Sequence, residues 1–156
     1  MKAAERYTAE MRYLIAVLLA LPGVAMAADT IPGPIQAEVI RVIDGDTIEV
    51  RAKIWLDQYI ETNVRLAGLD APELRGKCER EKALALRVKA RLEQLAKPGS
   101  RVRLTRIREG KYAGRVVAVV SFHYLYGQET LATVLIEEGL ARRYKGGRRE
   151  GWCDGE

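Results

Sequence analysis

The alternation of apolar and polar residues predicts short strands in the first half of the chain. Residues 36–43 and 47–54 are rich in β-branched residues, and the Asp44-Gly45-Asp46 turn between them indicates a hairpin. Residues 63–69 are typical of a third strand. It ends at Asp70-Ala71-Pro72, because a proline disfavours helix at the residue before it.

The second half of the chain begins with a helical pattern. Residues 79–96 predict one long helix, because apolar residues recur at helical spacing until Pro98-Gly99 ends the pattern: Leu84, Val88, Leu92 and Leu95. Residues 101–107 and 116–122 are typical of two more strands, and residues 130–138 of a short helix followed by Gly139. This order indicates a mixed α+β fold, a five-stranded Greek-key barrel with two helices, rather than a parallel α/β sheet.

The N-terminal residues are typical of an export signal. Met11-Arg12 precedes a short apolar run, and Ala25-Met26-Ala27 has the small-x-small pattern of a cleavage site. The run is shorter than the about 20 residues that span a bilayer. We interpret residues 1–27 as a signal peptide, with Met11 as an alternative start; a buried helix and an uncleaved anchor are the alternatives. Residues 28–35 are then a linker and residues 36–156 one domain of a periplasmic or secreted protein.

Charge and cysteine content add two expectations. The chain has 26 Lys and Arg against 21 Asp and Glu, and this basic surplus favours polyanionic partners without establishing one. Cys78 and Cys153 both follow the export signal. An even number of cysteines in an oxidising compartment indicates a disulfide, the alternative being two unrelated buried thiols.

Four carboxylates stand at the ends of predicted strands: Asp44, Asp46, Asp70 and Glu73. If they converge, these hard oxygen ligands select Ca²⁺ or Mg²⁺. Zinc is disfavoured because the chain has one histidine, His123, and two cysteines. Each acidic motif alone is more often an ordinary turn or helix cap than a metal site.

Two arginines lie near these acids in the sequence. Arg65 interrupts an apolar strand and should face away from Val64 and Leu66, either into a site or simply into solvent. Arg115 begins a strand directly after Gly114, which permits a tight turn. Two guanidinium groups beside a divalent cation would hold a phosphodiester, because arginine binds phosphate through two parallel hydrogen bonds.

Four segments together resemble the staphylococcal-type thermonuclease (SNase-like) family. They occur in the family's order: Ile43-Asp-Gly-Asp-Thr-Ile48, Val64-Arg-Leu-Ala-Gly-Leu-Asp-Ala-Pro-Glu73, Lys111-Tyr-Ala-Gly-Arg115 and Leu135-Ile-Glu-Glu-Gly-Leu-Ala141. The resemblance implies an OB-fold barrel and calcium-dependent hydrolysis of phosphodiester bonds in DNA and RNA, leaving 3′-phosphate ends.

The resemblance also implies a metal site. Asp46 and Asp70 match the family's carboxylate ligands to Ca²⁺, and Ala71 takes the position that contributes a backbone carbonyl. Asp44 matches an acid that acts through water. Glu73 matches the proposed general base, which takes a proton from the attacking water.

The remaining matched residues would contact the substrate. Arg65 and Arg115 match two phosphate-binding arginines, and three residues match positions around the bound nucleotide: Lys111, Tyr112 and Tyr144. The sequence departs from the family pattern in an extra residue, Ala113, in a shorter loop after Glu73, and in residues 142–149, which replace a long C-terminal helix.

Two functions fit these observations. The first is a monomeric metal-dependent nuclease acting on DNA and RNA, with no protein partner or membrane span. The second is a non-catalytic OB-fold module that binds single strands through basic and aromatic residues. Asp46, Asp70 and Glu73 favour the enzyme, because without a metal they would repel phosphate.

Overall fold

The computed structural model of the protein describes residues 29–122 and 129–153. The predicted signal peptide and His123 lie outside the described residues. Within them, no helix is both long enough and apolar enough to cross a membrane.

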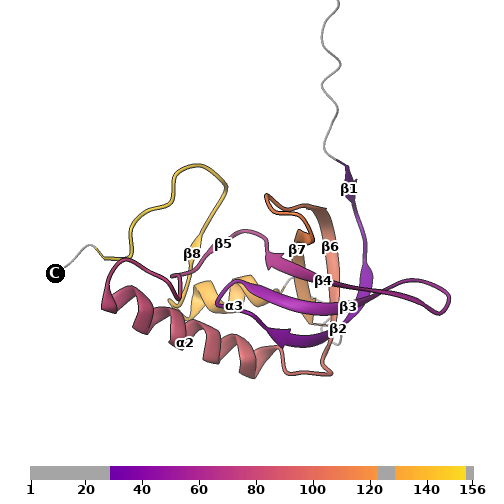
Figure 1. The fold of residues 1–156 in the computed structure, drawn as a ribbon, viewed down its shortest axis with the longest axis horizontal. Coiled ribbons are helices and arrows are strands. Elements are labelled where there is room, and N and C mark those ends of the chain that lie inside the picture. Colours follow the sequence, from indigo (N-terminus) through magenta and orange to yellow (C-terminus); the bar gives the residue numbers. More distant parts are fainter. Residues whose placement is uncertain (1–28, 123–128, 154–156) are drawn as a thin grey trace, which may run out of the picture.

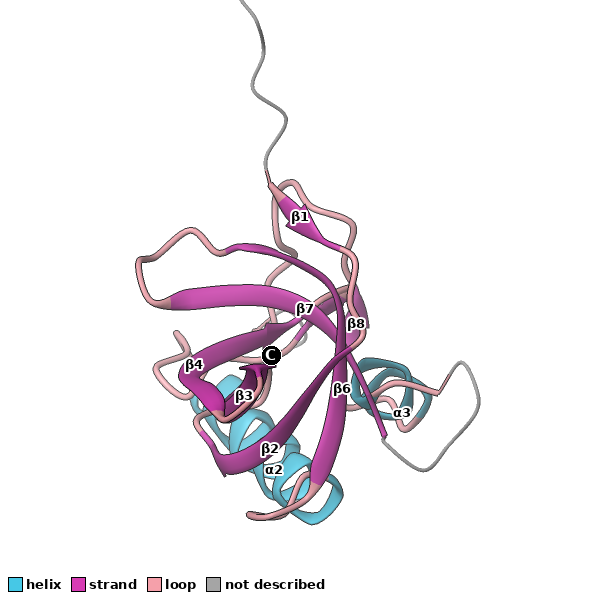
Figure 2. Ribbon diagram, turned by 90° about the vertical axis from the view of Figure 1, so that its right-hand side faces the viewer, coloured by secondary structure: helices cyan, strands magenta, loops and turns pink. Residues whose placement is uncertain are grey.

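Five strands form a closed barrel, shown end-on in Figure 2. The strands are β2 (Ile35–Val42), β3 (Thr47–Trp55), β4 (Gln58–Leu66), β6 (Arg101–Glu109) and β7 (Arg115–Phe122). They follow the order β6-β2-β3-β4-β7, and β7 pairs back with β6 to close the barrel. All pairs are antiparallel except β4–β7, which is parallel. The predicted five-stranded barrel with two helices is therefore confirmed.

Alternate strand residues fill the barrel, because successive side chains in a strand point to opposite faces. In β3, Ile48, Val50 and Ala52 are buried, and in β4 the buried residues are Val64 and Leu66. Arg65 lies between the latter two and faces outward, as the sequence predicted. The alternation thus places the core on one face and leaves the other face of β4 for Arg65.

Two helices pack on the barrel (Figure 1). The helix α2 (Glu79–Leu95) buries Val88 and Leu92 in the common core. The helix α3 (Leu131–Glu137) begins with a capping box, in which Thr130 and Thr133 exchange side-chain to backbone hydrogen bonds of 3.0 and 2.8 Å. Arg91 of α2 joins the two helices through an ion pair of 2.6 Å with Glu138.

The structure differs from the predicted elements in three places. The predicted linker contains a short strand, β1 (Thr30–Ile31), which pairs with β6. The strand β4 begins at Gln58, because β3 and β4 continue to pair up to a tight turn at Asp57. The predicted third strand is divided at Gly68, which has φ +84°. Its last residue, Leu69, belongs with Asp70 to a separate strand, β5 (Leu69–Asp70).

The C-terminal segment, residues 142–153, lies beside the N-terminal end of α2 (Figure 1). It starts with β8 (Arg142–Arg143), which pairs with β5. It is bonded at its end through the predicted disulfide between Cys78 and Cys153. Between these points, the Arg142 guanidinium donates to the Gly151 carbonyl at 2.9 Å and stacks 3.8 Å from the Trp152 ring centre. The segment is thus held at both ends.

Cleavage of the disulfide should lower the melting temperature. The bond joins residues 75 positions apart. In the chain-entropy model, closing such a loop stabilises a fold by about 4 kcal/mol, a large part of the about 5–15 kcal/mol typical of a domain. Thermal unfolding with and without reductant measures the effect. A Cys78→Ser/Cys153→Ser variant is the control and should melt as the reduced protein does, unaffected by reductant. Two free thiols in the non-reduced protein, by intact mass, would contradict the prediction.

Candidate active site

The turn between β2 and β3 holds the first two acids in fixed positions. The Asp46 N–H donates to Asp44 Oδ1 at 3.0 Å, and the Thr47 hydroxyl donates to Asp46 Oδ1 at 2.7 Å. The Leu66 N–H donates to the Asp46 carbonyl at 2.8 Å, which ties the turn to the end of β4. A Cβ at Gly45 would lie 3.1 Å from Val88 Cγ1. The turn therefore packs directly on α2.

The third acid reaches the same place from β5. Asp70 is the last residue of β5 and is only 4% exposed. Its backbone, not its side chain, pairs with Arg142 of β8. Ala71 follows it and is also buried. Buried carboxylates are costly unless they are paired with charge or coordinated by a metal. The position of Asp70 thus calls for a positive partner.

The two predicted arginines lie on the outer face of neighbouring strands. Arg65 of β4 is in register with Val117 of β7, and Arg115 is in register with Asn63, so both arginines share one face. Arg65 Nη1 makes an ion pair with Asp46 Oδ2. Burial lowers the pKa of Arg65, and the positive charges of Arg149 and Arg115 lower it further. Arginine nevertheless remains charged at neutral pH.

A cleft of about 460 Å³ brings most of the predicted residues together. Glu73 stands at its edge with 61% of its side chain exposed. The cleft is lined by seven residues that the sequence singled out: Asp44, Asp46, Arg65, Ala71, Glu73, Tyr112 and Arg115. The arrangement concentrates both signs of charge around one hollow.

The predicted nucleotide-binding residues are placed less uniformly. Tyr112 lines the cleft, and the Arg115 guanidinium stacks on its ring at 4.8 Å. The Lys111 ammonium lies 5.7 Å from the same ring, although Lys111 does not line the cleft. Tyr144 belongs to the C-terminal segment, where its hydroxyl donates to the Gly147 carbonyl at 2.8 Å. The structure therefore brings Tyr112 into the cleft and leaves Tyr144 outside it.

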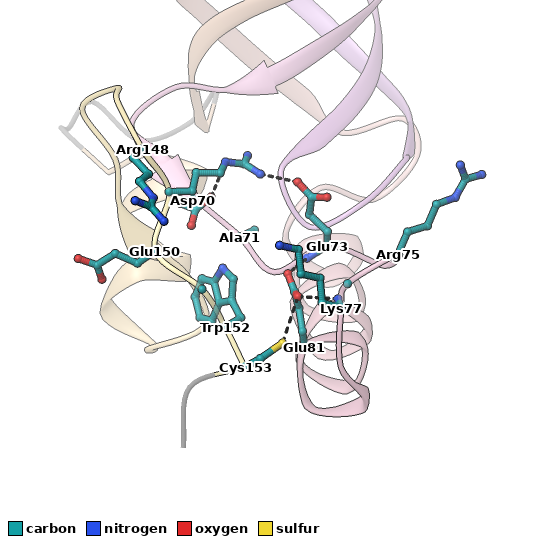
Figure 3. Close-up of a pocket in the computed structure, with 13 residues that line it drawn as sticks. Asp70, Ala71, Glu73, Arg75, Lys77, Glu81, Arg148, Glu150, Trp152 and Cys153 are labelled. Carbon is teal, nitrogen blue, oxygen red and sulfur yellow. Dashed lines mark hydrogen bonds and ion pairs between the residues drawn. The ribbon is translucent and has the colours of Figure 1, made fainter. Parts of the chain in front are cut away.

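An arginine that the sequence did not indicate lies among the acids. Arg149 makes ion pairs with Asp70 (Nε to Oδ1, 2.9 Å), Asp46 (Nη2 to Oδ2, 3.7 Å) and Glu73. Figure 3 shows Asp70 and Glu73 facing the same space, and dashed lines mark the ion pairs of Arg149 with these two acids. We call Asp46, Asp70 and Glu73 the carboxylate cluster. The sequence signals that this part of the chain would return to the cleft were the nearby Cys153 and the resemblance at Tyr144, and neither indicated Arg149.

A second missed residue, Glu81, shapes the loop that carries Glu73. Glu81 is buried on the first turn of α2, and its carboxylate accepts the N–H groups of Glu73 at 3.3 Å and Lys77 at 3.0 Å. The loop wraps so closely that a Cβ at Gly76 would lie 2.5 Å from the Glu81 side chain. An acid three residues after Cys78, at the third position of the predicted helix, was the signal available, since such acids often bind preceding backbone N–H groups.

The donor set of the cleft and of the adjacent Asp70 fits a hard cation. Asp46, Asp70 and the Ala71 carbonyl offer only oxygen atoms, which suits Ca²⁺ or Mg²⁺. Asp70 Oδ1 is buried and accepts no hydrogen bond within the described residues, although Arg149 pairs with its charge. A buried acceptor with free capacity is what a coordinated cation requires. The residues present therefore fit the calcium ion that the resemblance implies.

The sulfur-containing cluster nearby is not a metal site. Ligand atoms of Cys78, Glu81 and Cys153 lie within 4.8 Å of one another, but the two sulfur atoms are bonded to each other. Only a thiolate binds a metal as a cysteine ligand. The 3.7 Å approach of Cys153 Sγ to Glu81 is likewise a contact, because a disulfide sulfur has no hydrogen to donate.

The described chain has four buried polar residues, of which Asp46 lines the cleft: Asp46, Thr47, Asp70 and Glu81. Fold and cleft together define an OB-fold domain whose cleft is lined by both acids and arginines. A family model described as "Staphylococcal nuclease homologue" matches residues 63–151, more than half of the chain. The chain therefore belongs to the staphylococcal nuclease homologue family, a family of nucleases. A search of curated proteins found no significant match.

Loss of the Glu81 carboxylate should destabilise the protein. Glu81→Ala leaves two backbone N–H groups without their acceptor, at about 1–3 kcal/mol for a buried unsatisfied group. Glu79→Ala is the matched control on the same helical turn. Glu79 is exposed and pairs with Lys82 at 2.7 Å, so its loss should cost less than about 0.5 kcal/mol. Chemical denaturation measures both. Equal effects would show that Glu81 does not organise the loop.

Proposed function

We propose that the protein is a calcium-dependent nuclease that hydrolyses phosphodiester bonds of DNA and RNA and leaves 3′-phosphate ends. The observation that carries the proposal is that Asp46, Glu73, Arg65 and Arg115 line one cleft, with Asp70 held beside Asp46 and Glu73 through shared ion pairs. These residues come from three separated segments of the sequence. Membership of a nuclease family makes phosphodiester hydrolysis the chemistry that the arrangement fits best.

Each charged group has a distinct task in this proposal. Asp46, Asp70 and the Ala71 carbonyl hold the calcium ion, and Asp44 holds a water molecule beside it. When bound, the ion supplies positive charge that polarises the phosphoryl group. Glu73 accepts a proton from the attacking water, which makes the water a better nucleophile. The exposed position of Glu73 at the cleft edge leaves room for that water.

The arginines stabilise charge on the phosphoryl oxygens. Arg65 and Arg115 share one outer face, so two guanidinium groups can bind the same phosphate. Arg115 Nε is buried and donates no hydrogen bond within the described residues, so this donor is unsatisfied there. Donors held in place before the reaction stabilise the transition state without reorganisation. Tyr112, stacked on Arg115, offers an aromatic surface to the neighbouring nucleotide.

A non-catalytic single-strand-binding module is the second candidate. Its support is the OB-fold itself together with Tyr112, which is 58% exposed beside Lys111. Such a module needs basic and aromatic residues only. It has no use for buried acids such as Asp46 and Asp70, which repel phosphate and are costly to bury. The acids therefore favour the nuclease.

Export completes the proposal. The signal-peptide pattern of residues 1–27 supports export to the periplasm or medium. The disulfide agrees with an oxidising compartment, because cytosolic proteins seldom keep one.

Removal of divalent cations should abolish cleavage. Excess chelator should stop hydrolysis of single-stranded DNA, and Ca²⁺ in about the millimolar range should restore it. Mg²⁺ should support DNA binding better than turnover, because Mg²⁺ requires near-ideal octahedral coordination. Gel electrophoresis of a labelled strand measures the products. Asp70→Asn should remain inactive at every calcium concentration. Full activity in chelator would contradict calcium dependence, and binding without cleavage under all conditions would favour the second candidate.

Replacing either clamping arginine with lysine should lower kcat. Arg65→Lys and Arg115→Lys keep the positive charge but lose the paired donors, so kcat should fall by roughly 10²-fold. Steady-state kinetics at saturating calcium separates kcat from KM. Arg51→Lys is the matched control, since Arg51 pairs with Glu61 on an exposed face and does not line the cleft. A rise in KM alone would show that the arginines merely attract the polyanion.

A further inference from the structure

The Arg149 guanidinium lies where the carboxylate cluster converges. It makes an ion pair with each of the three acids. The contact with Asp70 involves the buried Oδ1 atom that accepts no hydrogen bond within the described residues. The Asp46 oxygen that it approaches, Oδ2, is also the oxygen paired with Arg65. Arg149 therefore supplies the positive charge that the buried acids require.

The fold holds Arg149 in this place through several independent contacts. Upstream, β8 pairs with β5, whose last residue is Asp70 itself. The Tyr144 N–H donates to the Gly68 carbonyl at 3.0 Å, and the Arg142 side chain reaches across the segment to the Gly151 carbonyl. Downstream, Cys153 is bonded to Cys78, which lies five residues after Glu73. The guanidinium is thus presented to the acids at a high effective concentration.

A divalent cation and the Arg149 guanidinium need the same oxygen atoms. Calcium binds carboxylate oxygens directly, at about 2.3–2.6 Å. Arg149 already contacts Asp70 Oδ1 at 2.9 Å. Two positive charges about 4 Å apart repel each other, and more strongly in a partly buried cleft than in water. The ion pairs of Arg149 must therefore be broken when a cation binds Asp46 and Asp70.

We propose that Arg149 is an internal counter-ion of the carboxylate cluster, that its ion pairs and the bound divalent cation exclude each other, and that the C-terminal segment thereby sets the metal affinity of the site. This inference rests on the proposed function in taking Asp46 and Asp70 as the metal ligands. The Cys78–Cys153 disulfide strengthens the competition, because it keeps Arg149 near the acids. Reduction of the bond raises metal affinity.

The test measures calcium binding by titration calorimetry without nucleic acid, so that it does not depend on activity. In Arg149→Ala the competitor is gone, and the calcium Kd should fall about tenfold, as expected if the arginine occupies the cluster in about nine of ten molecules. Arg148→Ala is the matched control. It removes the same charge one residue away, from a side chain that makes no ion pair with the cluster, and should change Kd less than twofold.

Thermal unfolding provides a second readout. In chelator, Arg149→Ala should melt below the wild-type protein, because Asp70 and Glu73 lose the arginine that pairs with them and Asp46 keeps only Arg65. Calcium should raise its melting temperature more than that of wild type, because tighter binding stabilises the folded state more. The Cys78→Ser/Cys153→Ser variant, tested at a low temperature where circular dichroism shows it folded, should also bind calcium more tightly. If that variant does not fold, Arg149→Lys serves instead and should give a Kd between those of wild type and Arg149→Ala.

Failures of this inference and of the proposed function give different results. Equal or weaker calcium binding by Arg149→Ala overturns the inference and leaves the nuclease proposal intact. An equal gain in Arg148→Ala also overturns it, because general charge would then explain the effect. Absence of cleavage in a protein whose Kd responds as expected overturns the proposed function alone. Calcium binding that survives in Asp46→Asn/Asp70→Asn overturns the metal site itself, and this inference with it.

Discussion

Repulsion among three carboxylates at one end of the barrel is the constraint to which the surrounding structure responds. Asp46 and Asp70 are buried, and buried acids of like charge require positive charge within a few ångströms. Arg65 provides it from the barrel wall and Arg149 from the C-terminal segment. In the proposed nuclease the same acids bind a divalent cation. Stability and metal binding therefore depend on the same electrostatic balance, in which arginine and metal act as alternatives.

The remaining architecture serves to hold these charges close without letting the site collapse. Gly45 permits the acidic turn to pack on α2 at a distance where a methyl group would crowd Val88. Glu81 accepts hydrogen bonds from backbone N–H groups of the loop that carries Glu73, so the backbone under the exposed Glu73 side chain is held in place. The disulfide joins this loop to the C-terminal segment. Loop and segment thus form two walls of one site, a device suited to a domain with a small core.

Much of the fold and of the site was predictable from the sequence. Alternation and helical spacing identify the five barrel strands and both helices, because side-chain burial follows the period of the backbone. The four acids and two arginines stand in short segments whose order resembles a known family. The least accurate boundaries were those where backbone pairing with a distant strand decides the conformation. Examples are β4, which extends along β3 to Gln58, and β1, which pairs with β6.

The sequence by itself determined the barrel, the export pattern, the pairing of the only two cysteines and the acids and arginines near the turns. Local periodicity and residue chemistry are sufficient for each of these. Only the tertiary structure decided that Arg149 meets the carboxylate cluster, that Glu81 supports Glu73 and that Tyr144 stays outside the cleft. These contacts join residues up to 103 positions apart, as between Asp46 and Arg149. No local sequence pattern indicates which side chain will pair with a buried charge so far away in the chain.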